Sequence, residues 1–176
     1  MIDGNRLALQ NLALFKSGKI ERNVVLKGPI SIGSGSVIWS GSYLEGPISI
    51  GDNCIIGPNS YIGNSVSIGD NTRIGAFSEI KDSIVMSDSI VGSYNSLVGT
   101  VVGNGTEFGT NVVANPSNRK VTYLDHTISL SERGAMVGNR CVIGNRAVLA
   151  GGSILLEGAT IGEGEVYNAD FQGDTI

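Results

Sequence analysis

The chain has 176 residues, a length that suits a single domain. It contains 26 glycines and only 6 % aromatic residues, which argues against an ordinary mixed core. The net charge of −4 argues against broad nucleic-acid binding. The sequence shows neither a long apolar run nor a signal-peptide pattern, so we expect a soluble, cytoplasmic protein without a membrane partner.

Residues 1–19 predict a short N-terminal helix that connects to the rest of the chain. Asp3 and Asn5 offer N-cap chemistry, leucines follow at an amphipathic spacing, and Gly18 is a typical stop signal. We interpret this helix as a cap over the open end of the repeat that follows, because the terminal coil of a solenoid exposes strand edges.

From Leu26 to Leu97 the sequence repeats every 18 residues, with GPISIG at Gly28 and Gly46 and IGDN at Ile50 and Ile68. Within each repeat, a shorter period of six places one large aliphatic residue in every hexapeptide. These residues are Ile20, Leu26, Ile32, Ile38, Leu44, Ile50, Ile56, Ile62, Ile68, Ile74, Ile80 and Met86.

A period of six with one large aliphatic residue per unit predicts a hexapeptide parallel β-helix, an all-β fold whose coils each consist of three short strands. The aliphatic residue points into the bore, and so does the small or β-branched residue four positions later. Cys54 and Cys141 hold that second position, so we expect packed thiols rather than a disulfide or a metal site. Gly, Asp and Asn occupy the corners, where positive φ is required.

The period weakens at Gly92, returns at Val98 and restarts four residues later at Val102. Residues 114–135 break it and are rich in charged and polar side chains, which fits either a surface loop with a short hairpin or a functional loop. The period then runs from Val137 to Ile161. We therefore expect a β-helix of about seven coils over residues 20–170, with a frayed acidic tail after Tyr167.

Four segments resemble the C-terminal domain of archaeal bifunctional sugar-1-phosphate nucleotidyltransferase/amino-sugar-1-phosphate acetyltransferases, within the hexapeptide acyltransferase superfamily. They are EGPISIGDNCIIGPNSYIG, IKDSIVMSDS, VVGNGTEFGTNVVAN and RGAMVGNRCVIG, and Asp3 to Leu14 is similar to the connector helix of those proteins. The resemblance implies a left-handed β-helix, a homotrimer with active sites between subunits, and acetyl-CoA bound along the outside of the coils. Nothing ahead of Ile20 resembles their nucleotidyltransferase domain, so the chain is either a stand-alone homologue or the C-terminal part of a longer protein.

The chain departs from this family at its catalytic histidine. In the corresponding stretch, GSYNSLVG (92–99), Ser93 or Tyr94 holds the place of the histidine, and neither is a base near neutral pH. Asn115 matches an asparagine of the family, and Lys120 falls near the lysine that binds the sugar phosphate in its members.

Acetyl transfer to an amine requires a base, a donor to the thioester oxyanion and a cation for the sugar phosphate. Our candidates are His126 as base, Asn115 with the cations Arg119 and Lys120 for the substrate, and the pair Arg140 and Arg146 for the CoA phosphates. Asp125 could orient a histidine of a neighbouring subunit. The simpler interpretation of His126, an exposed loop histidine, stays open.

The function we favour is acetyl-CoA-dependent N-acetylation of an amino-sugar phosphate, such as glucosamine-1-phosphate, in nucleotide-sugar biosynthesis. The alternative is a catalytically degenerate β-helix that serves a sugar nucleotidyltransferase as a trimerisation or ligand-sensing domain. A zinc site like that of the γ-class carbonic anhydrases, which share the fold, would need the single histidines of three subunits to meet on the threefold axis. We expect no metal requirement for the transfer reaction.

Overall fold

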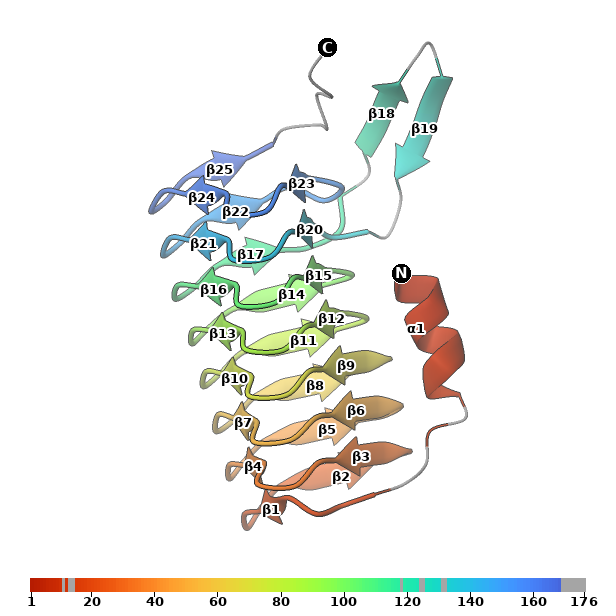
Figure 1. The fold of residues 1–176 in the computed structure, drawn as a ribbon, viewed down its shortest axis with the longest axis vertical. Helices are drawn as coiled ribbons and strands as arrows, with labels where there is room; N and C mark the ends of the chain where they lie inside the picture. The colour runs from red at the N-terminus through yellow and green to blue at the C-terminus, as the bar shows by residue number, and fades with distance from the viewer. Residues whose placement is uncertain (11, 13–14, 118, 124–125, 131–132, 169–176) are drawn as a thin grey trace.

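The computed structural model describes residues 1–10, 12, 15–117, 119–123, 126–130 and 133–168. Across these residues the chain forms a parallel β-solenoid of about seven turns with one short helix, α1 (Ile2–Leu9), as Figure 1 shows. The predicted β-helix is confirmed, and the solenoid is consistent with the left-handed form that the resemblance implies.

Three parallel sheets form the walls of the solenoid in the described part of the chain. The first sheet contains β1 (Lys19–Ile20), β4 (Val37–Ile38), β7 (Ile55–Ile56), β10 (Arg73–Ile74), β13 (Ile90–Val91), β16 (Glu107–Phe108), β21 (Val142–Ile143) and β24 (Thr160–Ile161). The second contains β2 (Val25–Lys27), β5 (Tyr43–Glu45), β8 (Tyr61–Gly63), β11 (Glu79–Lys81), β14 (Ser96–Val98), β17 (Val113–Ala114), β22 (Val148–Leu149) and β25 (Val166–Tyr167). The third contains β3 (Ile30–Ile32), β6 (Ile48–Ile50), β9 (Val66–Ile68), β12 (Ile84–Val85), β15 (Val101–Val102), β20 (Met136–Val137) and β23 (Ile154–Leu155).

The bore is filled by the residues that the period predicts. Ile56, Ile62 and Ile80 are fully buried. Between them, small hydroxyl residues satisfy backbone carbonyls of the next coil, as where Ser42 Oγ donates to the Gly57 carbonyl at 2.8 Å. Cys54 and Cys141 are buried free thiols, which confirms their packing role.

The predicted period departs from the structure in the coil that includes β12, and Ile20 of the first coil is 37 % exposed. Val85, not Met86, pairs with Ile68, because the corner before β12 is one residue shorter than the corner before β9. Asn64 and Ser65 both have positive φ at the longer corner, whereas Asp82 alone has it at the shorter one. The predicted inward positions Met86 and Val98 are therefore wrong. The inward side chains are those of Val85, Val91 and Leu97.

Helix α1 lies beside the third sheet instead of over the end of the bore, so the predicted cap is wrong (Figure 1). Its N-cap is Met1, and Asp3 lies inside the first turn. Contacts with distant coils hold it there, including a hydrogen bond from Asn5 Nδ2 to the Ser65 carbonyl at 3.0 Å. Gly18 does not end the helix, because the chain has already entered the first coil at the Lys16–Ile32 bridge.

The irregular segment contains an antiparallel hairpin, β18 (Arg119–Tyr123) and β19 (His126–Leu130), which projects from the solenoid between β17 and β20 (Figure 1). The expected frayed tail falls on residues 169–176, outside the described residues. In the described part of the chain no helix is long and apolar enough to cross a membrane.

Candidate functional site

A chain of polar contacts runs up the outer face of the second sheet. Its lower part begins where Lys27 Nζ lies 2.7 Å from Glu45 Oε1 and Tyr61 donates its hydroxyl to Glu45 Oε2 at 3.1 Å. Lys81 Nζ then lies 5.7 Å from the centre of the Tyr61 ring and 3.4 Å from Glu79 Oε1. Because strands of this sheet stack in register, residues 17 or 18 positions apart meet on this face.

The contacts around Glu45 shift the pKa values of Glu45, Lys27 and Tyr61. The hydrogen bond from Lys27, and after it the one from Tyr61, lowers the pKa of Glu45. The hydrogen bond to Glu45 is the largest cause of the raised pKa of Lys27. The pKa of Tyr61 is raised mainly by burial and next by its hydrogen bond to Glu45. Gly63 permits this arrangement, since a Cβ there would lie 2.6 Å from the Tyr61 hydroxyl oxygen.

At the upper end of this face, Ser96 lies between two acceptors at the foot of the hairpin. Its Oγ is 3.3 Å from Glu79 Oε2 and 3.1 Å from Asn115 Oδ1, and it can donate its single proton to one of them at a time. Asn115 follows β17 directly and is half-buried. The contact with Ser96 engages the carbonyl oxygen of the Asn115 amide and not its NH₂ group.

The hairpin carries the other predicted substrate and catalytic residues. In its register Arg119 pairs with Leu130 at the base, Lys120 with Ser129, and His126 with Tyr123 at the far end. At about 3.3 Å of rise per residue, the His126 backbone lies about 13 Å along β19 from the base. Asn115 lies four residues before the strand that begins with Arg119. The His126 backbone lies at the opposite end of the hairpin from the Arg119 backbone. Asp125 lies outside the described residues.

The two predicted CoA-binding arginines lie at different corners of the same coil. Arg140 precedes β21 and forms an ion pair with Glu157, and Arg146 precedes β22 and forms an ion pair with Glu163. Each guanidinium is thus neutralised by a carboxylate of the following coil. The two arginines do not converge on one point.

Tyr94, one of the two residues that the resemblance aligns with a catalytic histidine, stacks on Phe77 with ring centroids 5.1 Å apart and an interplanar angle of 6°. Both side chains are about half exposed, and both residues have positive φ, at 61° and 56°. Bulky side chains in this backbone region are unusual. Ser93 precedes this aromatic pair at the same corner.

Sequence reasoning missed Glu79, Ser96 and the rest of the polar chain. The 18-residue repeat could have revealed these contacts, because Lys27 and Glu45 are one repeat apart, as are Tyr43 and Tyr61. Among the residues that the structure describes, no group of three or more His, Cys, Asp or Glu side chains is placed to hold a metal ion.

Comparisons with known proteins agree with the hexapeptide repeat. The family model "Bacterial transferase hexapeptide (six repeats)" matches residues 47–82. No curated protein sequence matches the chain. Solved structures give distant matches at 14–16 % identity, and this chain spans 58–63 % of the length of the three described next.

One match is the acetyltransferase domain of PglB from Neisseria gonorrhoeae (16 % identity, 90 % of this chain, 63 % of that chain, TM-score 0.47). Another is the UDP-N-acetylglucosamine acyltransferase of Arabidopsis (14 % identity, 86 % of this chain, 60 % of that chain, TM-score 0.49). A third is PerB from Caulobacter crescentus, solved with CoA and GDP-perosamine (15 % identity, 89 % of this chain, 58 % of that chain, TM-score 0.42). At these identities the likeness is one of fold, and the chemistry of this chain has to be argued from its own residues.

Proposed function

We propose that this chain is a CoA-dependent acetyltransferase whose acceptor is an amino-sugar phosphate such as glucosamine-1-phosphate. The observation that carries the proposal is the cluster of Glu79, Ser96 and Asn115 at the foot of the hairpin. The transferase family match over residues 47–82 supports the reaction class. A place in nucleotide-sugar biosynthesis is part of the same proposal.

In this proposal Asn115 stabilises the oxyanion. Ser96 Oγ at 3.1 Å holds the Asn115 carbonyl oxygen, so the amide NH₂ is oriented to donate to the thioester oxygen as negative charge develops on it. Arg119 and Lys120, four and five residues after Asn115, supply positive charge for the phosphate of the acceptor.

The base in this proposal is His126, acting at a site shared with a neighbouring subunit. The backbone of His126 opens β19 at the far end of the hairpin, away from the base where β18 begins. A homotrimer with active sites between subunits would bring the hairpin end of one subunit to the second sheet of the next. The histidine would take the proton from the acceptor amine as the C–N bond forms and the CoA thiolate leaves.

CoA binding in this proposal uses Arg140 and Arg146. Each is paired with one carboxylate and is at least 65 % exposed, so a phosphate group can displace or share Glu157 or Glu163. The arginines lie at separate corners. We therefore assign them to separate phosphates, or to CoA molecules at different subunit interfaces.

The stacked Tyr94 and Phe77 favour a second candidate function. An aromatic stack next to the position that corresponds to the family base fits a degenerate β-helix that trimerises or senses ligands for a sugar nucleotidyltransferase. Acetyl-CoA binding separates the two functions only in part, because a sensor can bind it as well. Turnover of acetyl-CoA with the amino-sugar phosphate separates the two functions fully, because only the acetyltransferase predicts it.

The test of the proposal is a His126→Ala substitution assayed with acetyl-CoA and glucosamine-1-phosphate. We expect kcat to fall by about 10²-fold or more, in the range of a lost general base, with acetyl-CoA affinity unchanged. Unchanged turnover would show that His126 is not the base. Absence of turnover in the unaltered protein would favour the degenerate module.

A further inference from the structure

The N-terminal turn of α1 covers an apolar cavity on the third sheet. The cavity has a volume of about 170 Å³ and adjoins a more open groove of about 440 Å³ that extends over β20 and β23. Its apolar lining comes from five side chains, two of them on α1 or its cap. They are Met1, Ile2, Val101, Met136 and Ile154.

Three glycines line the cavity with backbone only. Gly99, Gly134 and Gly152 lie one above the other at the corner between the second and third sheets, joined by backbone hydrogen bonds of 2.9 and 2.8 Å. At the same corner of lower coils, Asn64 and Asp82 carry side chains.

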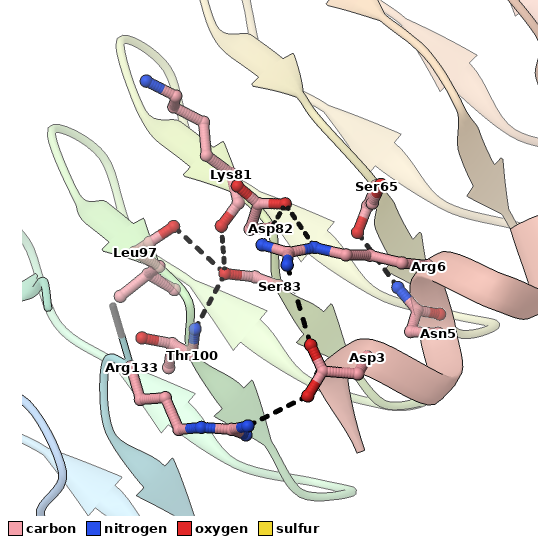
Figure 2. Close-up of polar contacts among 10 residues, drawn as sticks. All are labelled: Asp3, Asn5, Arg6, Ser65, Lys81, Asp82, Ser83, Leu97, Thr100 and Arg133. Carbon is pink, nitrogen blue, oxygen red and sulfur yellow. Dashed lines mark hydrogen bonds and ion pairs between the residues drawn. The ribbon is translucent and has the colours of Figure 1, made fainter. Parts of the chain in front are cut away.

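The rim of the cavity carries a guanidinium that is ion-paired with a carboxylate of α1. Arg133, at the end of the hairpin segment, lines the cavity, and its guanidinium lies 2.9 Å from Asp3 Oδ2 (Figure 2). Asp3 is shared, because Arg6 lies 3.6 Å from its other oxygen, and Arg6 pairs with Asp82 at 3.1 Å. A guanidinium has five N–H donors, so Arg133 can bind a second carboxylate beside Asp3.

We propose that this cavity binds a small apolar monocarboxylate, with its hydrocarbon tail beneath α1 and its carboxylate on Arg133. The volume is close to the roughly 150 Å³ of an apolar protein cavity that stays dry and binds benzene. The apolar lining selects a hydrocarbon, and the guanidinium at the rim selects an anion. Asp3 competes with the ligand for the same guanidinium. This site does not depend on the proposed transfer reaction, because it lies on the third sheet and uses none of the residues assigned to that reaction.

Titration with sodium hexanoate, followed by ligand-observed NMR or calorimetry, tests the proposal. We expect hexanoate to bind more tightly than the uncharged hexanol. Asp3→Asn removes the competing carboxylate and should strengthen hexanoate binding about tenfold, without a similar effect on hexanol. Arg133→Gln should weaken hexanoate to the level of hexanol. Met136→Trp, at a half-exposed position, should fill the cavity and weaken both ligands.

Arg146→Gln is the matched control, since Arg146 is also an exposed arginine with a single described carboxylate partner but lies at another corner. It should leave hexanoate binding unchanged. Circular dichroism and thermal unfolding establish that each variant is folded. Equal binding of hexanoate and hexanol, failure of hexanoate to bind both the unaltered protein and Asp3→Asn, or an equal loss in Arg146→Gln would each overturn the proposal.

Discussion

Tyr94 lies parallel to Phe77 of the preceding coil, with 5.1 Å between ring centroids, and both residues hold a left-handed backbone conformation. Asn59 and Asn111 occupy the same corner of the adjacent coils, with φ of 55° and 61°. Asparagine tolerates this conformation better than an aromatic residue. The ring contact therefore offsets part of the backbone strain at this corner.

A double-mutant cycle with Phe77→Asn and Tyr94→Asn measures that offset. Each single substitution relieves strain at one residue and removes the stack, whereas the second substitution relieves strain without a further loss of stacking. We expect a coupling energy of about 1 kcal/mol from urea unfolding at fixed protein concentration. Additive effects would show that the rings do not stabilise each other.

A second prediction concerns the short corner before β12. Val85 is fully buried and pairs with Ile68, whereas Met86 is half-buried outside the bore. Val85→Ala should lower the free energy of unfolding by about 2 kcal/mol, because it leaves a cavity. Met86→Ala should cost less than about 1 kcal/mol. If Met86→Ala lowers the free energy of unfolding as much as Val85→Ala, or more, the register described for this coil is wrong.

The sequence predicts the core well wherever the period is unbroken, and the reason is local. Ile62 and Ile80 are each fixed by neighbours in their own hexapeptide, and both are fully buried. The error at Met86 arose because one corner residue is missing between two aliphatic runs, and Ile84, Val85 and Met86 look alike by hydrophobicity.

The position of α1 could not be predicted in this way. It depends on contacts between residues far apart in the chain, such as Asn5 with Ser67 and Arg6 with Asp82, which no period relates. The same holds for the cavity under α1. The polar face of the second sheet is different, because the repeat already brings Lys27 opposite Glu45.

Acid should weaken the fold partly through Glu45. Its pKa is lowered in the folded state, first by the hydrogen bond from Lys27, so its contribution is present above the ordinary pKa of 4.5 and is lost as the pH falls through the folded-state pKa. Glu45→Gln should therefore reduce the loss of stability between neutral pH and values below 4.5, and Lys27→Met should reduce it as well. Thermal unfolding across this range checks both. If the stability of Glu45→Gln falls with decreasing pH as steeply as that of the unaltered protein, Glu45 does not contribute to the acid sensitivity.

The oxyanion role proposed for Asn115 predicts a graded pair of kinetic effects. Asn115→Ala should lower kcat by about 10²-fold, since it removes the donor itself. Ser96→Ala should lower kcat by about tenfold with little change in KM, because Ser96 acts only by orienting the amide 3.1 Å away. Ser49→Ala, on the outer face of the third sheet, is the control. A larger effect at Ser96 than at Asn115 would contradict these roles.

The most direct test is the release of free CoA thiol when the purified protein is mixed with acetyl-CoA and glucosamine-1-phosphate. Cys54 and Cys141 are fully buried, so they should add little background to a thiol reagent. We predict release that requires both substrates and disappears in His126→Ala. Release no faster with the amino-sugar phosphate than without it would contradict the acetyltransferase assignment and favour a non-catalytic β-helix.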